Sequence, residues 1–166
     1  MKEVTAMSAN PQESTGRSLR RPNFSLSHIV APTDFFSNSK KAVDYAIQLA
    51  RRMGVMLTLL HIVPEPRALD YSMEGISVQE LQGSKEEATK RLADELAKAK
   101  LEYQQVDAVQ GSALHPRDQI VRAATNLSAD LLVLSTHGYT GWKHFLFGSD
   151  AEKILERAPC PVLVVR

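Results

Sequence analysis

The stretch 28–63, HIVAPTDFFSNSKKAVDYAIQLARRMGVMLTLLHIV, holds two apolar segments with an amphipathic segment between them. Residues 28–34 predict a short strand that ends in a loop. Residues 37–54 predict a helix, with serines available to cap its start and Gly54 to end it. One face of this helix collects the apolar side chains Ala42, Val43, Ala46, Ile47, Ala50 and Met53. The nearly continuous apolar run 55–63 is typical of a strand buried on both faces of a parallel sheet.

The alternation of strands and helices continues to the end of the chain. After a long connection at 64–83, in which a short helical piece fits, we expect helices at 84–103, 115–129 and 149–158, and strands at 103–111, 130–136 and 160–166. The inward faces of the first two of these helices are Ala88, Leu92, Leu96, Ala99 and Tyr103, and Ile120, Val121, Ala124 and Leu127. Regular alternation implies right-handed crossovers and a doubly wound parallel α/β sheet with helices on both faces.

The composition is that of one globular domain preceded by a tail. Of 166 residues, 43% are hydrophobic and 23% charged, with a formal net charge of +1. Residues 1–27 are polar and follow neither period, which predicts a disordered N-terminal tail and a folded domain at 28–166. A basic docking or targeting arm is the alternative, since Arg17, Arg20 and Arg21 lie close together.

Charge, hydropathy and cysteine content restrict the partners. The near-neutral chain offers no broad basic face, so we expect no nucleic acid. No apolar run approaches the ~20 residues of a membrane span, so we expect no membrane partner. The single cysteine, Cys160, excludes an intrachain disulfide and fits a reducing compartment, so we expect a cytoplasmic protein. We interpret Cys160 as a small buried hydrophobe rather than a reactive thiol.

A candidate ligand site follows the first and fourth predicted strands. Ligands of doubly wound sheets bind beyond the carboxyl ends of the strands, where the strand order reverses. This rule points to PTDFFSNS at 32–39 and to STHGYTGWKHFLFGSD at 135–150. In the second of these segments, Gly138 and Gly148 allow close backbone approach, and Ser149 opens a helix whose free amides favour a phosphate. The alternative is a capping box, because Ser149 and Glu152 have the S-x-x-E spacing. Neither a G-x-G-x-x-G fingerprint nor a P-loop is present.

At 28–166 the chain resembles the universal stress protein family, on HIVAPTDFFSNSKKAVDYAIQLA, LTLLHIV and LLVLSTHGYTGWKHFLFGSDAEKILERAPCPVLVVR. The resemblance implies a Rossmann-like five-stranded sheet of order 3-2-1-4-5 and homodimers paired through the last strand. The family's nucleotide-binding pattern is G-x-x-G, nine residues, then G-[ST]. Gly138, Gly148 and Ser149 match it, and Ser135 replaces the first glycine.

The resemblance also implies roles for individual residues. Pro32, Thr33 and Asp34 would border adenine and ribose, Ile62 would flank the base, Ser135 would lie against the ribose, and His137, Gly138, Gly148 and Ser149 would surround the phosphates. Two of these residues have alternatives: Asp34 as a turn or cap residue, and His137 as a loop histidine bonded to backbone. Asp150 would lie close to the phosphates, where a divalent cation such as Mg2+ could bridge them.

The function implied by the resemblance is that of a stress-response protein. It would bind ATP, or the related AMP or ADP, and act as a dimeric nucleotide-dependent regulator with protein partners that the sequence does not identify. A dimeric interaction module without nucleotide is the alternative, and a slow ATPase ranks third. We expect no enzymatic main function, because Ser149, His137 and Asp34 each already have a binding or capping explanation.

Overall fold

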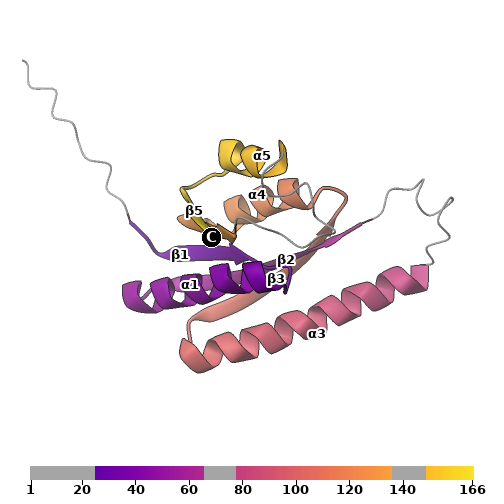
Figure 1. Cartoon of the computed structure of the whole chain (residues 1–166), viewed down its shortest axis with the longest axis horizontal. Coiled ribbons are helices and arrows are strands. Elements are labelled where there is room, and N and C mark those ends of the chain that lie inside the picture. Colours follow the sequence, from indigo (N-terminus) through magenta and orange to yellow (C-terminus); the bar gives the residue numbers. More distant parts are fainter. Residues whose placement is uncertain (1–24, 66–77, 136–148) are drawn as a thin grey trace, which may run out of the picture.

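The computed structural model describes residues 25–65, 78–135 and 149–166. In these ranges strands and helices alternate along the chain, as the sequence predicts (Figure 1). The strands form one parallel sheet of order β3-β2-β1-β4-β5, which confirms the predicted fold class. The strands are β1 (His28–Pro32), β2 (Met56–Pro64), β3 (Val106–Ala113), β4 (Leu131–Ser135) and β5 (Val162–Val165). The helices are α1 (Ser37–Met53), α3 (Val78–Glu102), α4 (Pro116–Asn126) and α5 (Ser149–Arg157).

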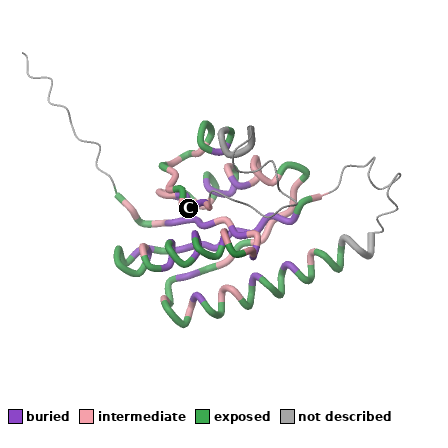
Figure 2. Tube along the Cα trace, viewed as in Figure 1, coloured by how far each residue is buried: buried purple, intermediate pink, exposed green. Residues whose placement is uncertain are grey.

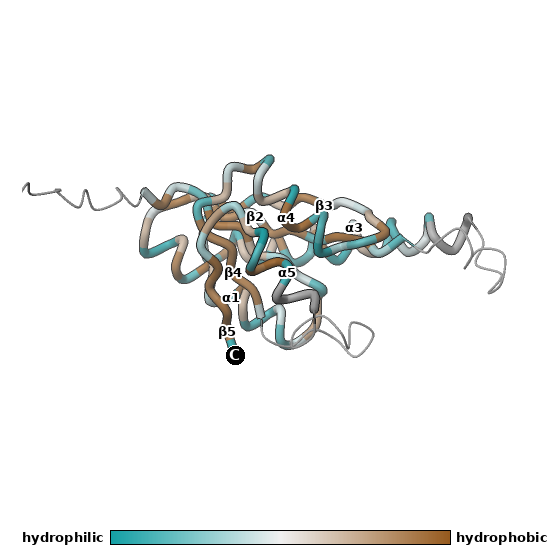
Figure 3. The backbone as a smooth tube through the Cα atoms, turned by 90° about the horizontal axis from the view of Figure 1, so that it is seen from above, coloured by the Kyte–Doolittle hydropathy of each residue, from teal (hydrophilic) through white to brown (hydrophobic). Residues whose placement is uncertain are grey.

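The helices cover the sheet in two layers. Helices α1 and α3 lie on one face, and α4 and α5 on the other (Figure 1). Alternate residues of β1 serve the two layers, since Ile29 packs with α1 and α3 whereas Val30 packs with α4 and α5. Buried residues are concentrated in the strands, and the outer sides of the helices are exposed (Figure 2). The same division appears as apolar strands and more polar helices in Figure 3.

The central strand β1 marks the point where the strand order reverses. Ile29, Val30 and Ala31 have no solvent exposure, because strands and helices surround them. From β1 the chain adds β2 and β3 on one side of the sheet and then returns to add β4 and β5 on the other. The helices that follow β1 and β4, α1 and α5, therefore lie in opposite layers, and the carboxyl ends of the two strands lie side by side between them (Figure 1). This is the arrangement that places a ligand at these strand ends.

Helix α1 follows the prediction except at its ends. Its predicted inward residues are buried apart from Met53, the last residue of the helix, which is 53% exposed. The predicted serine N-cap is wrong: Phe36 occupies the cap position without a side-chain bond. Gly54 ends the helix in the left-handed conformation, at φ 67°, and donates its N–H to the carbonyl of Ala50.

Helix α3 begins at Val78, six residues before the predicted start, so the end of the predicted connection is helical. Residues 66–77 lie outside the described ranges. Ala88, Leu92 and Ala99 are buried against the sheet, and Leu96 and Tyr103 pack beside them. In α4, Ile120 and Ala124 are buried and Val121 and Leu127 pack at the margin, so the predicted inward stripes of both helices are confirmed.

The amino edge of β1 is held by one carboxylate. Oδ2 of Asp130, just before β4, accepts hydrogen bonds from Ser27 N (2.8 Å), Ser27 Oγ (2.6 Å) and His28 N (3.1 Å). These bonds lower the pKa of Asp130, with the Ser27 hydroxyl contributing most. His28 adds a bond from Nδ1 to the carbonyl of Leu127 at 2.8 Å. We call Ser27, His28 and Asp130 the amino-edge clasp.

The last strand, β5, forms an edge of the sheet next to β4. Cys160 precedes it, half-buried and packed against the α4 and α5 layer, where burial raises the pKa of its thiol. Within the part of the chain that the structure describes, no helix is long and apolar enough to cross a membrane.

Candidate functional site

The turn that follows β1 is built around Thr33, one of the predicted site residues. Its N–H donates to the carbonyl of Leu60 at 2.8 Å, which extends the β1 and β2 pairing by one residue. Its carbonyl accepts a bond from Nδ1 of His61 at 2.8 Å. Its hydroxyl donates to Oε2 of Glu95 at 3.0 Å and accepts from the N–H of Phe35 at 3.1 Å. Thr33 is therefore buried, with each polar group bonded inside the protein.

Asp34 is the next residue of the turn and the predicted ligand of the ribose. Its Oδ1 accepts the N–H of Phe36 at 3.0 Å and the hydroxyl of Ser39. The same serine hydroxyl lies 3.0 Å from the carbonyl of Phe36 and 3.4 Å from the hydroxyl of Thr33. Asp34 thus organises the turn before α1, as its alternative interpretation predicts. The carboxylate also lies at the carboxyl edge of β1, where the ligand hypothesis requires it.

Phe35 gives this turn an unusual backbone. Its φ is 68°, in the left-handed region that a bulky side chain rarely occupies. The ring is 7% exposed, 4.3 Å from the ring of His61 between centroids, with the Arg91 guanidinium 4.7 Å above it. Arg91 also lies 5.6 Å from the ring of Phe36. These stacking contacts stabilise a backbone that would favour glycine on conformational grounds alone.

Two titratable groups lie beneath the turn, the buried His61 and the partly buried Glu95. Burial lowers the pKa of His61, because it disfavours the imidazolium, and the bond to Thr33 opposes this effect. Burial raises the pKa of Glu95, and the hydroxyl of Thr33 acts in the opposite direction. Glu95 comes from α3, so this helix reaches the turn after β1 directly.

The turn borders two cavities that share the Phe35 ring as a wall. A groove of about 350 Å3 runs between α1 and α3, lined by Val43, Ile47 and charged residues that include Lys40, Asp44 and Glu95. A smaller cavity of about 190 Å3 lies between the turn, the end of β2 and α3, with Asp34, His61 and Arg91 in its lining.

Ile62, the predicted flank of the base, lies on the opposite face of the sheet. It is buried in the α4 and α5 layer, beside a cavity of about 170 Å3 that Leu60, Gly111 and Gln119 also line. A β-carbon placed on Gly111 would lie 3.1 Å from Cδ1 of Ile62, so the glycine leaves room for the isoleucine. Ile62 remains a predicted site residue.

The remaining predicted site residues follow the end of β4. Ser135 is the last residue of β4, paired with Val165, and Pro32, at the end of β1, pairs with Leu60. Ser149 is the first residue of α5. The fold therefore brings the ends of β1 and β4 to one edge. His137, Gly138 and Gly148 lie outside the described residues, as does the side chain of Ser149. The predicted phosphate site at Gly138, Gly148 and Ser149, which we call the cradle, and the capping box therefore both stay hypotheses.

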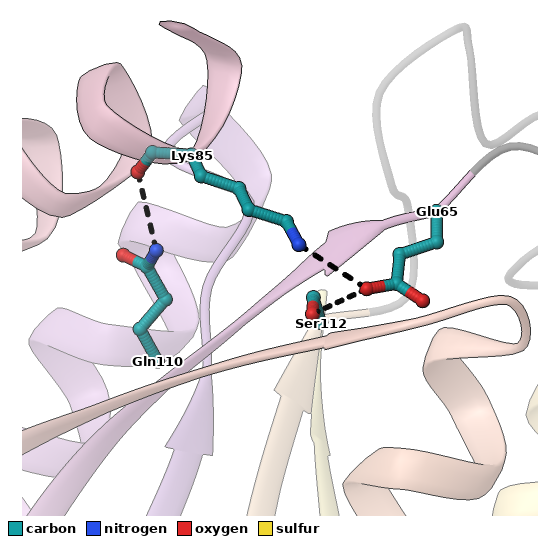
Figure 4. Close-up of polar contacts among 4 residues, drawn as sticks. All are labelled: Glu65, Lys85, Gln110 and Ser112. Carbon is teal, nitrogen blue, oxygen red and sulfur yellow. Dashed lines mark hydrogen bonds and ion pairs between the residues drawn. The ribbon is translucent and has the colours of Figure 1, made fainter. Parts of the chain in front are cut away.

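A second polar cluster at the carboxyl edge was missed by sequence reasoning (Figure 4). Oε1 of Glu65, just after β2, accepts bonds from Ser112 Oγ at 2.6 Å and Lys85 Nζ at 3.3 Å. These two donors, Ser112 first, lower the pKa of Glu65. Gln110 donates to the carbonyl of Lys85 at 3.2 Å and joins β3 to α3. Applying the carboxyl-edge rule to the second and third predicted strands would have pointed to Glu65 and Ser112.

The described residues contain no group of three or more His, Cys, Asp or Glu arranged to hold a metal ion. The described site offers a carboxylate at the end of β1 and the start of a helix beyond β4 as binding groups. A helix N-terminus at this edge suits an anionic group, and an aspartate suits a hydroxyl donor.

Known proteins with the same fold and related sequences identify the family. The universal stress protein family model matches residues 26–166. The chain is 31% identical over 144 residues to universal stress protein MJ0531 of Methanocaldococcus jannaschii, an alignment that covers 83% of this chain and 81% of the relative. It is 29% identical over 135 residues to universal stress protein YxiE of Bacillus subtilis, covering 77% and 90%.

A solved structure agrees with these sequence relationships. Universal stress protein UspA from Lactobacillus plantarum superposes with a TM-score of 0.68 at 21% identity, covering 84% of this chain and 97% of that chain. Its similarity shows the shared fold. Since the family model spans the whole of the described sheet and its helices, the chain belongs to the universal stress protein family.

Proposed function

We propose that this protein binds an adenine nucleotide at the carboxyl edge between β1 and β4 and acts as a dimeric, nucleotide-dependent regulator in the stress response. One observation carries the proposal: the strand order reverses between β1 and β4, so the turn with Asp34 and the start of α5 share this edge. The connection between β4 and α5 contains Gly138 and Gly148, with nine residues between them, and Ser149 follows.

Two solved relatives support the choice of ligand. One is a universal stress protein in complex with cAMP, with a TM-score of 0.60 at 24% identity. Another, from Archaeoglobus fulgidus, is in complex with dAMP, with a TM-score of 0.60 at 19% identity. Both ligands join an adenine to a phosphate. The same class, represented by ATP, ADP or AMP with or without Mg2+, is the ligand that we propose here.

The proposed roles divide between the two strand ends. Pro32, Asp34 and Ser135 border the nucleoside, and Ile62 flanks the base from β2. His137, Gly138, Gly148 and Ser149 surround the phosphates. Because the polar groups of Thr33 are bonded within the protein, we assign this residue the support of Asp34 rather than a direct contact.

Calorimetric titration with ATP, ADP and AMP, each with and without Mg2+, tests the proposal, together with mass spectrometry of any nucleotide released from freshly purified protein. Replacing Gly138 and Gly148 by leucine should abolish binding, because side chains would occupy the space of the phosphates. Gly83→Leu is the matched control, since an added β-carbon there meets no atom within 4 Å. Unchanged affinity in the double variant would refute the cradle.

We propose that the dimer forms through β5, and the hydrogen-bond pattern of this strand suggests how to test the proposal. The N–H of Leu132 donates to the carbonyl of Pro161 at 3.0 Å. Because bonding residues alternate along a parallel strand, the N–H of Val164 points to the open edge of the sheet, where its side chain is 41% exposed. Val164→Pro should therefore give monomers that remain folded.

Leu163→Pro is the contrasting variant, because the N–H of Leu163 points toward β4 and its loss should destabilise the fold. Sedimentation velocity and circular dichroism measure the two effects. A dimer of unchanged stability in Val164→Pro would count against pairing through β5. A cytoplasmic location completes the proposal and rests on the cysteine content of the sequence.

A further inference from the structure

A chain of side-chain contacts connects α3 to Asp34. Oε2 of Glu95 accepts the hydroxyl of Thr33 at 3.0 Å. The hydroxyls of Thr33 and Ser39 lie 3.4 Å apart, and Ser39 donates to Oδ1 of Asp34. Glu95 lies 62 residues beyond Thr33 in the sequence, so this contact arises only when α3 packs on the sheet.

The position of Glu95 is costly for a residue that only packs. Its side chain is partly buried in the groove between α1 and α3, and this burial raises the pKa of the carboxyl. Asp34 and Asp44 add like charge, and Lys40 adds the opposite charge. An apolar side chain of similar size would avoid the desolvation of a carboxyl group and would fit beside the apolar residues of the same groove.

We propose that Glu95 is a positioning residue for the nucleotide site: through Thr33, whose hydroxyl also accepts the N–H of Phe35, it fixes the turn 33–36 and thereby the orientation of the Asp34 carboxylate. This inference rests on the proposed nucleotide function and adds α3 to the elements that determine affinity. Arg91, one turn earlier on α3, strengthens the same connection, because it stacks on Phe35 and Phe36 in this turn.

The test compares Glu95→Leu with Glu95→Gln. Leucine removes the acceptor but keeps an apolar fit in the groove, whereas the glutamine amide oxygen can still accept from Thr33. Asp94→Leu is the matched control, since it makes the same change of charge one residue away, in the same groove, at a residue for which no bond to the turn is found among the described residues. Each variant is examined by thermal unfolding, by calorimetry with ATP, ADP and AMP, and by amide hydrogen exchange of residues 33–39 without nucleotide.

We expect Glu95→Leu to change the unfolding temperature little, because the relieved desolvation of the carboxyl offsets the bond lost by the Thr33 hydroxyl, which can turn to Ser39. The variant should bind nucleotide about five-fold more weakly, the effect of losing about 1 kcal/mol. The amide of Phe36, which donates to Asp34, should exchange faster by a similar factor. Glu95→Gln should restore both properties, and Asp94→Leu should change neither. A merely structural role would lower stability and affinity together.

Two results would overturn the inference. One is wild-type affinity in Glu95→Leu, and the other is unchanged exchange at Phe36 in that variant. If the wild type binds none of the nucleotides, the proposed function fails instead. The exchange data then decide on their own whether Glu95 positions the turn, because they require no ligand.

Discussion

The amino-edge clasp predicts that removing the Asp130 carboxylate lowers the stability of the fold substantially. In Asp130→Ala, Ser27 N, Ser27 Oγ and His28 N all lose their acceptor. A hydrogen bond to a charged group contributes about 1.5 to 3 kcal/mol. Because water can replace part of each lost bond here, we take about 1 kcal/mol for each backbone donor and expect about 2 kcal/mol in total. For a domain of this size that corresponds to roughly 4 to 8 °C in Tm.

Urea unfolding at pH 7 measures this effect against two partial variants. Ser27→Ala removes the hydroxyl alone and should lower the free energy of unfolding by less than about 1 kcal/mol. Asp130→Asn keeps one acceptor without charge, so its loss of stability should lie between those of Ser27→Ala and Asp130→Ala. The native pKa of Asp130 is lowered, so its charge stabilises the fold above the unfolded value of 3.8. The gap between wild type and Asp130→Asn should therefore shrink as pH falls below 3.8. A free energy of unfolding for Asp130→Ala within about 0.3 kcal/mol of the wild-type value would refute the role of the clasp.

Two further perturbations address the turn after β1 and the end of α1. His61→Phe keeps a ring against Phe35 but leaves the carbonyl of Thr33 without its donor, so urea unfolding at pH 7.5 should show a loss of about 1 to 3 kcal/mol. Because the pKa of His61 is lowered, wild-type stability should fall as pH drops below 6.5, and that slope should be weaker in the variant; equal slopes would exclude His61 as the cause. Gly54→Ala should cost about 1 kcal/mol in the same assay and Gly54→Asn less, since the strain of φ 67° rather than a clash is responsible; equal losses would contradict this.

The sheet could be predicted from the sequence because its signals are local. The run 55–63 is apolar at every position except Thr58 and His61, as a doubly covered strand requires, and Gly54 stops α1 where the pattern ends. The early start of α3 at Val78 was missed because weakly periodic residues can join a helix whose stability comes from later turns. The N-cap of α1 was missed because Ser39 bonds to the carboxylate of Asp34.

The candidate site was predictable only in part. The turn after β1 and the start of α5 follow from the strand order, which local patterns and the family resemblance supply. The contribution of α3 does not follow, because Glu95 and Arg91 look like ordinary charges on a solvated helix face. Their contacts with Thr33 and Phe35 depend on how α3 crosses the sheet, a property of tertiary packing alone.

Phe35 imposes a trade-off on anyone who redesigns this fold. Glycine at 35 would relieve a backbone strain of about 1 to 2 kcal/mol, but it would also remove a buried aromatic side chain, a loss that costs about 3 to 5 kcal/mol. The same change would remove the ring that lines both the groove between α1 and α3 and the smaller cavity, and on which the Arg91 guanidinium stacks. Libraries screened only for stability should therefore retain the aromatic ring in spite of its strained backbone, and with it the separation of the two cavities.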